Sequence, residues 1–444
     1  MDLRDKKVLV VGLARTGREC ARFLVTQGAN VLISDRRAEE ELKDEIAELA
    51  GMPVRYLLGG EDRTWLEGVD AVVPSPGVPA ENALVQEARA RGIEILSEIE
   101  LAYRFLHMPL VAITGTNGKS TTTTLLAEIL KANNTKAFAG GNIGAPLIGF
   151  VAGEWDWGVV EISSFQLDWV EQFRPRIAVL LNLTEDHLDR YPDFDAYCRA
   201  KARIFQAQAQ SDTAVLNRDD SRVWAVRERI QARVLSFGFS EVNEGTFAAG
   251  SEIIWRDGSK EERFSLSQVK IQGVHNIENM MAAIAAAKAI GIAAPVIQKA
   301  LEAFPGLEHR LEFVREKSGV RYYNDSKGTN VGALMRSLAS FSQPVILIAG
   351  GVDKGGDYTV LRDGIRRRVK RLVLFGAARE IIAKALGHLT ETVIVDDLPA
   401  AVNDASEHAQ PGDVVLLSPA CSSFDMFRDY AERGRVFKSL VQAL

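Results

Sequence analysis

VAITGTNGKSTTTTLLAEIL, Val111 to Leu130, is the stretch that decides the fold of the central part of this chain. Apolar residues lead into Gly-Thr-Asn-Gly-Lys-Ser, and Leu and Ile then recur with the spacing of an amphipathic helix. The usual P-loop, G-x-x-x-x-G-K-[ST], has a glycine five positions before Gly118, where this chain has Ile113. The stretch therefore predicts a strand, a shortened P-loop and a helix.

The residue types of this loop fit a triphosphate and Mg²⁺. Gly115 and Gly118 let the backbone turn tightly and bring N–H groups close to an anion, and Lys119 supplies a positive charge. The hydroxyl of Ser120 is suited to Mg²⁺, and the helix that follows points its positive end at the phosphates. The alternative is a Gly-rich turn that binds nothing, but it gives Lys-Ser-Thr-Thr no packing purpose. We expect a triphosphate to bind at this loop.

Length and composition indicate a soluble protein of several domains. A chain of 444 residues exceeds one hydrophobic core, so two to four domains are expected. The formal net charge of −6 argues against a general affinity for nucleic acid or membrane. Cys20, Cys198 and Cys421 lie far apart, which predicts neither a disulfide framework nor a thiolate zinc site. No signal peptide or long apolar run is recognised, so we expect a cytoplasmic location.

The pattern along the chain predicts the α/β class. Short β-branched runs such as KKVLVVG, NVLISD and DAVVPSPG alternate with helical patterns, which favours parallel sheets with crossover helices. A break falls near 92–98, and the turn-rich FPGLEHR closes a second section. The polar run 240–260 resembles β-hairpins. We therefore expect three domains, residues 1–97, 98–306 and 307–444, the central one P-loop ATPase-like and the outer two Rossmann-like.

Downstream of the loop, acidic residues and a histidine follow two further predicted strands. Glu161 ends the apolar run of VVEIS, where a carboxylate is costly unless it is paired or metal-bound. His187 follows in NLTEDHLDRY, and ligand sites form where parallel strands end. TEDHLD could instead begin a helix capped by Thr184, although this would not explain His187. Lys201, between Arg199 and Arg203, reads by itself as a solvated surface charge.

The loop VGLARTG near the N-terminus allows two interpretations. It is not G-x-G-x-x-G, since four residues separate Gly12 from Gly17. Asp35 nevertheless ends the next strand at about the distance expected of a ribose-binding acid. A nucleotide site and a simple strand–helix turn both remain open at this point.

Taken together, several motifs resemble the Mur ligases over essentially the whole chain and in the right order. They are GTNGKST (115–121), EISSFQL (161–167), NLTEDHLDRY (182–191), GVHNIEN (273–279), GLEHRLE (306–312), NDSKGTN (324–330), GGVDKG (350–355) and LSPACSSFD (417–425). The asparagine in GTNGKS and the absence of a D-N-P-R motif are similar to the members that add D-glutamate. The resemblance implies ATP-dependent addition of D-glutamate to UDP-N-acetylmuramoyl-L-alanine through an acyl phosphate, in peptidoglycan precursor synthesis, by a monomer.

The resemblance also implies roles for individual residues. Lys119, Glu161, His187 and Lys201 would be catalytic; Ser120 and Glu161 would hold one Mg²⁺, and His187 and a carbamylated Lys201 a second. ATP would contact Gly115, Thr116, Asn117, Gly118, Lys119, Ser120, Thr121, Asn276, Asn279, Arg310 and Asp325. The UDP substrate would contact Arg15, Thr16, Asp35, Arg36, Ser75 and Asn142, and D-glutamate would contact Lys327, Thr329, Lys354, Ser423 and Phe424.

Three rival functions remain at this stage. One is a related ligase that adds another amino acid, including a folylpolyglutamate synthetase, which shares the phosphate loop. Another is a nucleotide-binding dehydrogenase that uses VGLARTG, but no second motif for hydride chemistry accompanies it. A third is a non-catalytic ATP-dependent regulatory protein, which would have no need of Glu161, His187 and Lys201 at these spacings.

Overall fold

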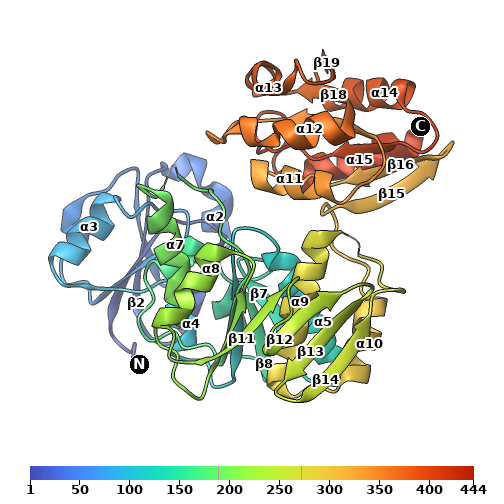
Figure 1. Cartoon of the computed structure of the whole chain (residues 1–444). Helices are drawn as coiled ribbons and strands as arrows, with labels where there is room; N and C mark the ends of the chain where they lie inside the picture. Colours follow the sequence, from blue (N-terminus) through green and yellow to red (C-terminus); the bar gives the residue numbers. More distant parts are fainter. Residues whose placement is uncertain (189, 272) are drawn as a thin grey trace.

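The structure is a computed structural model that describes residues 1–188, 190–271 and 273–444. Within these residues the strands form three separate sheets that follow one another along the chain, the first drawn in blue, the second in cyan to yellow and the third in orange to red (Figure 1). The predicted α/β class with three sections is confirmed. None of the helices in the described ranges is both long and apolar enough to cross a membrane.

The first sheet has the order β3-β2-β1-β4-β5 and is parallel throughout. Its strands are β1 (Lys7–Val11), β2 (Asn30–Asp35), β3 (Val54–Leu58), β4 (Ala71–Pro74) and β5 (Glu94–Ile95), joined by α1 (Arg15–Thr26), α2 (Lys43–Ala47) and α3 (Ala83–Ala90). The chain order reverses between β1 and β4, and a ligand crevice forms outside the strand ends at such a point. The loops after β1 and β4 therefore meet there. Helix α4 (Glu98–Tyr103) leads into the second sheet.

The second sheet has the order β14-β13-β12-β11-β10-β9-β6-β8-β7. Its strands are β6 (Leu110–Thr114), β7 (Ala137–Gly141), β8 (Trp157–Glu161), β9 (Ile177–Leu180), β10 (Thr213–Asn217), β11 (Arg233–Gly238), β12 (Glu244–Ala249), β13 (Glu252–Asp257) and β14 (Lys260–Ser265), with α5 (Lys119–Ala132), α6 (Ser164–Leu167), α7 (Phe194–Ala202), α8 (Ser221–Ala225), α9 (Val274–Ile290) and α10 (Ala294–Ala303). Among the described strands of this sheet, only β12, β13 and β14 form antiparallel pairs, which confirms the predicted hairpins. Helix α9 is Ala-rich and packs its small side chains tightly against α5 and the sheet.

The third sheet has the order β15-β16-β20-β17-β18-β19, with only β15 antiparallel among its described strands. Its strands are β15 (Glu312–Lys317), β16 (Val320–Asn324), β17 (Val345–Gly350), β18 (Val369–Phe375), β19 (Glu391–Ile394) and β20 (Val414–Leu417), and its helices are α11 (Val331–Ala339), α12 (Arg362–Arg368), α13 (Arg379–Leu386), α14 (Leu398–His408) and α15 (Tyr430–Ala443). Helices cover both faces of the sheet, and each face has its own apolar cluster beneath its helices.

The three parts are joined in different ways. One apolar cluster runs without a break from Val10 and Leu24 of the first part to Leu147 and Ile162 of the second. The clusters of the third part contain only its own residues. Polar bonds link the third part to the second, as described below. The first two parts are therefore joined by a shared apolar core, and the third by directional contacts.

Candidate functional site

Three neighbouring strands of the second sheet bring the predicted catalytic residues together. β6 lies between β8 and β9, and all three run parallel, so their carboxyl ends share one edge. The phosphate loop follows β6, Glu161 ends β8, and the segment with His187 follows β9. Residues that are distant in the sequence therefore meet at this edge because of strand order.

The phosphate loop has the backbone that its glycines predicted. Gly118 has a φ of 86°, and a Cβ there would lie 2.2 Å from Oδ1 of Asn279, so only glycine fits. The ammonium of Lys119 donates to the carbonyls of Gly115 (2.9 Å) and Thr116 (2.8 Å), and thus lies over the loop. Burial, with Arg310 nearby, lowers the pKa of Lys119 although Glu161 opposes the shift. Lys119 is thus placed where a nearby anion would stabilise its positive charge.

Glu161 is a buried carboxylate with one oxygen unused. Its side chain is 2% exposed, and Oε1 accepts from Nδ2 of Asn142 at 2.7 Å. Oε2 is buried and has no hydrogen-bond partner among the described residues. Burial acts to raise the pKa of Glu161, but Lys119, Ser120 and Asn142 outweigh it and lower the pKa. A buried ionised oxygen without a partner is costly, and a divalent cation would satisfy it.

The segment after β9 is a loop and not the start of a helix. The interpretation of Thr184 as a helix cap is wrong, because the next helix, α7, begins at Phe194 with Asp193 as its cap. His187 has a φ of 56°, and its ring packs against Phe165 with centroids 4.7 Å apart. Burial lowers the pKa of His187, so the imidazole is neutral near pH 7 and free to act as a ligand. Asp189 lies outside the described residues.

Lys201 is buried and not a surface charge. It lies near the end of α7 with 2% exposure, and its Nζ is 4.8 Å from the ring centroid of Tyr197. Burial, together with Lys119, lowers the pKa of Lys201 well below its usual value. A lysine in this environment favours the neutral, nucleophilic amine. The flanking Arg199 and Arg203 gave no sign of this burial in the sequence.

A cavity lies between the second and third parts of the chain and collects many of the predicted nucleotide residues. Asn117, Gly118, Thr121, Asn276, Asn279, Arg310 and Asp325 line it, and so does Lys327, which was predicted for D-glutamate. Gly115 and Thr116 belong to the adjoining loop, and Lys119 and Ser120 begin α5. Arg310 donates from Nη2 to Oγ of Ser120 at 3.2 Å, across the two parts. The cavity is therefore assembled from both.

Sequence reasoning missed other residues that line this cavity. They are Asn182, His275, Glu278, Arg336 and Ser337. Burial lowers the pKa of His275 to about 4, so its ring is neutral. His275 and Glu278 adjoin the predicted asparagines of α9 and could have been found by that proximity. Arg336 and Ser337 face the cavity from α11 with no local motif to mark them.

A second cavity lies at the switch point of the first sheet. Asp35 and Arg36, which the resemblance assigns to the UDP substrate, line it together with Gly12, Ser34, Gly77 and two residues that sequence reasoning missed, Glu61 and Asn82. Asp35 accepts from the backbone N–H of Leu13 at 2.9 Å, and Ser75 donates to the carbonyl of Gly12 at 2.9 Å. Both bonds fix the VGLARTG loop at the cavity. Arg15 and Thr16 lie on α1 and are not among the lining residues.

Asn142 does not belong to this second cavity. It lies on the loop after β7 and bonds Glu161, at the edge of the second sheet. A different residue connects the two sites. Arg190 donates to the carbonyls of Pro76 (3.0 Å) and Val78 (2.8 Å), and so joins the loop after β9 to the loop after β4.

The residues predicted for D-glutamate follow neighbouring strands of the third sheet. Lys327 and Thr329 follow β16, Ser423 and Phe424 follow β20, and Lys354 follows β17. Lys327 donates to Oγ of Ser120 at 3.4 Å, and burial lowers its pKa to about 8. Ser423 is buried, whereas Phe424 is 73% exposed and Lys354 is also exposed. Asn330 donates to Oδ2 of Asp186 at 3.1 Å and forms another bond between the second and third parts.

Family models match each of the three parts. The Mur ligase MurD-like N-terminal domain matches residues 6–97, the Mur ligase middle domain 113–287, and the Mur ligase glutamate ligase domain 309–421. UDP-N-acetylmuramoylalanine–D-glutamate ligase of Geobacter metallireducens is 52% identical over 100% of this chain and 99% of that protein. The ligase of the same name from Geotalea uraniireducens is 51% identical over the same shares.

A solved structure supports the fold independently. The pseudomurein peptide ligase type C from Methanothermus fervidus superposes with a TM-score of 0.62 at 18% identity, over 99% of this chain and 100% of that one. At that identity the likeness is one of fold. Sequence, strand order and the residues gathered at the strand ends agree, and the chain belongs to the Mur ligase family, whose members are ATP-dependent amide-forming ligases.

Proposed function

We propose that this protein joins the terminal carboxylate of UDP-N-acetylmuramoyl-L-alanine to the amine of D-glutamate, converting ATP to ADP and phosphate. The observation that carries the proposal is the edge of the second sheet, where Lys119 and the unpaired Oε2 of Glu161 lie beside the cavity shared with the third part. The names of the relatives that match along the full chain support the choice of substrates.

The residues at this edge fit Mg²⁺. The unpaired oxygen of Glu161 and the hydroxyl of Ser120 are hard oxygen ligands of the kind that Mg²⁺ takes. The described residues hold no group of three or more His, Cys, Asp and Glu side chains suited to a metal. A second ion at His187 therefore needs another anionic ligand. The neutral amine favoured at Lys201 could supply one by adding CO₂ to form a carbamate.

The chemistry begins with a poor electrophile. The substrate carboxylate attacks the γ-phosphorus of ATP, the bond to ADP breaks, and the resulting acyl phosphate can accept an amine. Lys119 would offset charge on the phosphoryl oxygens, and bound Mg²⁺ would neutralise more of it. The amine of D-glutamate then attacks, phosphate leaves, and the amine proton passes to a base that we do not assign. Exclusion of water by the joined domains would protect the acyl phosphate.

The remaining candidates fall into two substrate sites. For D-glutamate, Lys327 and Lys354 would meet the two carboxylates, and Thr329 and Ser423 would add hydroxyl donors, with Phe424 at the margin. For the UDP substrate, Asp35, Arg36 and Ser75 adjoin the cavity of the first sheet. Arg15, Thr16 and Asn142 would bind parts of the substrate that extend beyond that cavity.

The same proposal covers organisation and location. We assign the UDP substrate to residues 1–97, ATP to 98–306 and the amino acid to 307–444. We also propose that the protein acts as a monomer. The use of ATP and a UDP-linked precursor supports work in the cytoplasm.

An amino-acid panel tests the proposed function. Purified protein, ATP, Mg²⁺ and UDP-N-acetylmuramoyl-L-alanine are supplied with D-glutamate, L-glutamate or another amino acid, and ADP release is measured with the amide product. We expect product with D-glutamate to exceed product with L-glutamate by a wide margin. A preference for L-glutamate on a folate acceptor would indicate a folylpolyglutamate synthetase instead, and no amide product would refute the proposal.

A further inference from the structure

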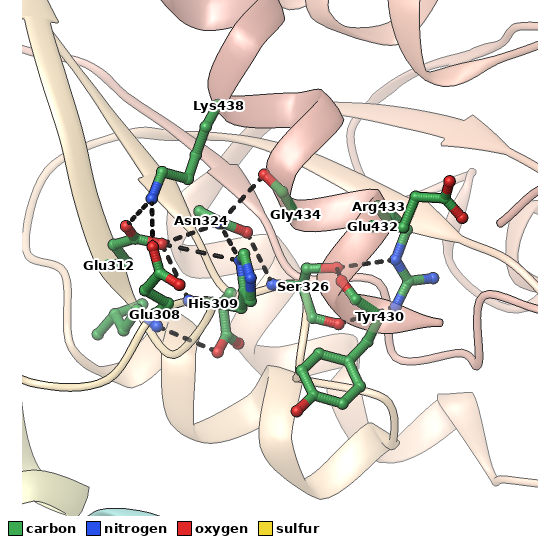
Figure 2. A network of polar contacts seen from close by, with 12 residues as sticks. Glu308, His309, Glu312, Asn324, Ser326, Tyr430, Glu432, Arg433, Gly434 and Lys438 are labelled. Carbon is green, nitrogen blue, oxygen red and sulfur yellow. Dashed lines mark hydrogen bonds and ion pairs between the residues drawn. The ribbon is translucent and has the colours of Figure 1, made fainter. Parts of the chain in front are cut away.

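A fully buried arginine connects two loops of the third part. Arg433 lies in the first turns of α15 with 0% exposure. Its Nε and Nη2 donate to Oγ (3.0 Å) and to the carbonyl (2.8 Å) of Ser326. Its Nη2 and Nη1 also donate to the carbonyls of Cys421 (3.2 Å) and Ser422 (3.3 Å). Figure 2 shows the guanidinium directed at Ser326 from the helix.

The position of Arg433 costs free energy, because its charge is buried. Among the described residues, the four hydrogen bonds of Arg433 go to hydroxyl or carbonyl oxygens and none to a carboxylate. Burial lowers the pKa of Arg433 to about 10, with Cys421, Asp425 and Asp325 opposing the shift, so the group still carries its charge near pH 7. A buried charge without a direct counter-ion contributes little to stability, because the free-energy cost of removing it from water is large. The rigid fork of donors does, however, fix the distance between the groups it bonds.

The two loops that Arg433 connects carry the candidates for the amino-acid substrate. Ser326 directly precedes Lys327, in the loop after β16. Ser422 directly precedes Ser423, in the loop after β20. Arg433 itself is sealed from solvent and cannot touch a substrate. Its hydrogen bonds reach the backbone next to Lys327 and Ser423, which would touch the substrate.

We propose that Arg433 is a positioning residue that sets the spacing of the Ser326–Thr329 and Cys421–Phe424 loops, and so the fit of the amino-acid substrate. This rests on the proposed assignment of D-glutamate to those loops. A dicarboxylate held at both ends depends on the distance between its binding groups, and a displacement of about 1 Å can be severe. A loosened pair of loops would therefore weaken binding of the amino acid first.

Lys327 and Gly328 of the same loop also line the nucleotide cavity, but that cavity has further supports that do not pass through Arg433. Asp325, which lines that cavity, accepts from the hydroxyls of Ser337 and Ser418, both at 2.7 Å. It also accepts from the backbone N–H of Leu311 at 3.2 Å. These bonds hold Asp325 without Arg433. The structure therefore predicts a selective effect on one of the three substrates.

The helix that carries Arg433 is itself fixed next to the loop (Figure 2). Asn324 donates from Nδ2 to the carbonyl of Gly434 at 3.3 Å and to Oε2 of Glu312 at 3.0 Å. A Cβ on Gly434 would lie 2.2 Å from Nδ1 of His309, which shows how closely α15 approaches that ring. A helix held at this close approach gives the guanidinium one direction, as a spacer requires.

The test compares Arg433→Lys and Arg433→Met with the wild type, each with all three substrates. Lysine retains the charge but loses the fork, and methionine removes both. We expect the KM for D-glutamate to rise about tenfold or more, and the KM values for ATP and the UDP substrate to stay within about twofold. Ser326→Ala removes only one acceptor and should give a smaller rise in the KM for D-glutamate.

Arg371→Lys is the matched control. Arg371 is also a buried arginine of the third part, but it lies on β18 and bonds Asp404 of α14 and Glu391 of the edge strand β19. We expect it to lower the melting temperature without a selective change in KM. The proposal is overturned if a folded Arg433→Lys keeps its KM for D-glutamate, or if the KM values for all three substrates rise together. If the wild type makes no D-glutamate product, the proposed function fails instead.

Discussion

At the scale of single residues, Glu161 has an unmet requirement. One oxygen bonds Asn142 and the other is buried without a partner among the described residues. The carboxylate is nevertheless held ionised, because Lys119, Ser120 and Asn142 lower its pKa against the effect of burial. The protein therefore keeps a charge in place for a ligand and not for its own stability.

Glu161→Gln tests this use of the charge. Glutamine keeps the acceptor for Asn142 but replaces the unpaired oxygen with a donor, so the fold should survive and the cation should not bind. We expect ligation to fall by about a hundredfold or more, with little change in the melting temperature. The control is Glu185→Gln, on an exposed residue of a nearby loop. Near-normal turnover by Glu161→Gln would argue against the metal assignment.

Lys201 supports a second residue-level prediction. If its amine is carbamylated, Lys201→Ala removes an anionic ligand and should lose most ligation, and acetate or another short carboxylate should restore part of it. The measurement is ADP release with acetate, compared with chloride at the same ionic strength. Lys119→Ala, which removes a cation, should gain nothing from acetate. If acetate restores no activity to Lys201→Ala, the carbamate has no support.

At the scale of elements, Glu98 at the start of α4 joins the first and second parts of the chain. It accepts from the backbone N–H of Ile148 at 2.7 Å, in the short helix η3 (Leu147–Phe150). Its other oxygen is buried without a partner among the described residues, and burial raises its pKa from 4.5 to about 7. Burial therefore favours the protonated carboxyl in the folded protein, although the hydrogen bond from Ile148 favours the ionised form.

The sign of the pH effect follows from this shift. The folded state retains the proton up to about pH 7, whereas the unfolded state loses it near 4.5, so Glu98 contributes stability below pH 4.5 that is lost as pH rises through 7. The full loss is roughly 3 kcal/mol. Glu98→Gln should match the wild type in thermal unfolding at low pH and exceed it at pH 8. Glu154→Gln, on an exposed residue, is the control, and equal stability of Glu98→Gln and wild type at pH 8 would contradict the shift.

Much of the element structure could be predicted because its signals are local. Val111 to Leu130 contains its own strand, turn and helix signals, and the glycine requirement at Gly118 follows from the same stretch. The interpretation of Thr184 as a cap failed because a side chain that can cap a helix also suits an irregular loop. Here Thr116 Oγ1 accepts the backbone N–H of Thr184, and the loop stays next to the phosphate turn.

Other features depend on contacts between distant segments, which no local pattern carries. Lys201 has the neighbours of a surface residue, and only the packing of α7 against the sheet buries it. Arg336, Glu61 and Asn82 line cavities because separate loops converge on them. The family resemblance supplied roles for many residues, Lys201 among them, but not for Arg336, Glu61, Asn82 or Arg433.

At the scale of the whole molecule, the joint between the second and third parts is polar. Arg310 and Lys327 both donate to Ser120, and Asn330 donates to Asp186. The cavity at this joint is lined from both sides. A nucleotide bound there would contact both parts at once and stabilise their association.

Hydrogen exchange tests this prediction on the full chain. An ATP analogue with Mg²⁺ should slow amide exchange in 115–121 and also in 325–337, because both segments border the cavity. The β13–β14 hairpin, at the far edge of the second sheet, should be unchanged. Arg310→Ala should reduce the effect in the third part more than in the second. Protection confined to 115–121 would show that the cavity is not a shared nucleotide site.

Arg190 gives the first and second parts a connection of another kind. It holds the carbonyls of Pro76 and Val78, and it stands three residues after His187. A shift of the loop after β4 therefore pulls on the backbone next to the reacting groups. A truncated substrate without its nucleotide would leave that loop empty and would react slowly even at saturation. Binding of the uridine part of the substrate would thus contribute to turnover, although uridine takes no part in the amide bond that forms.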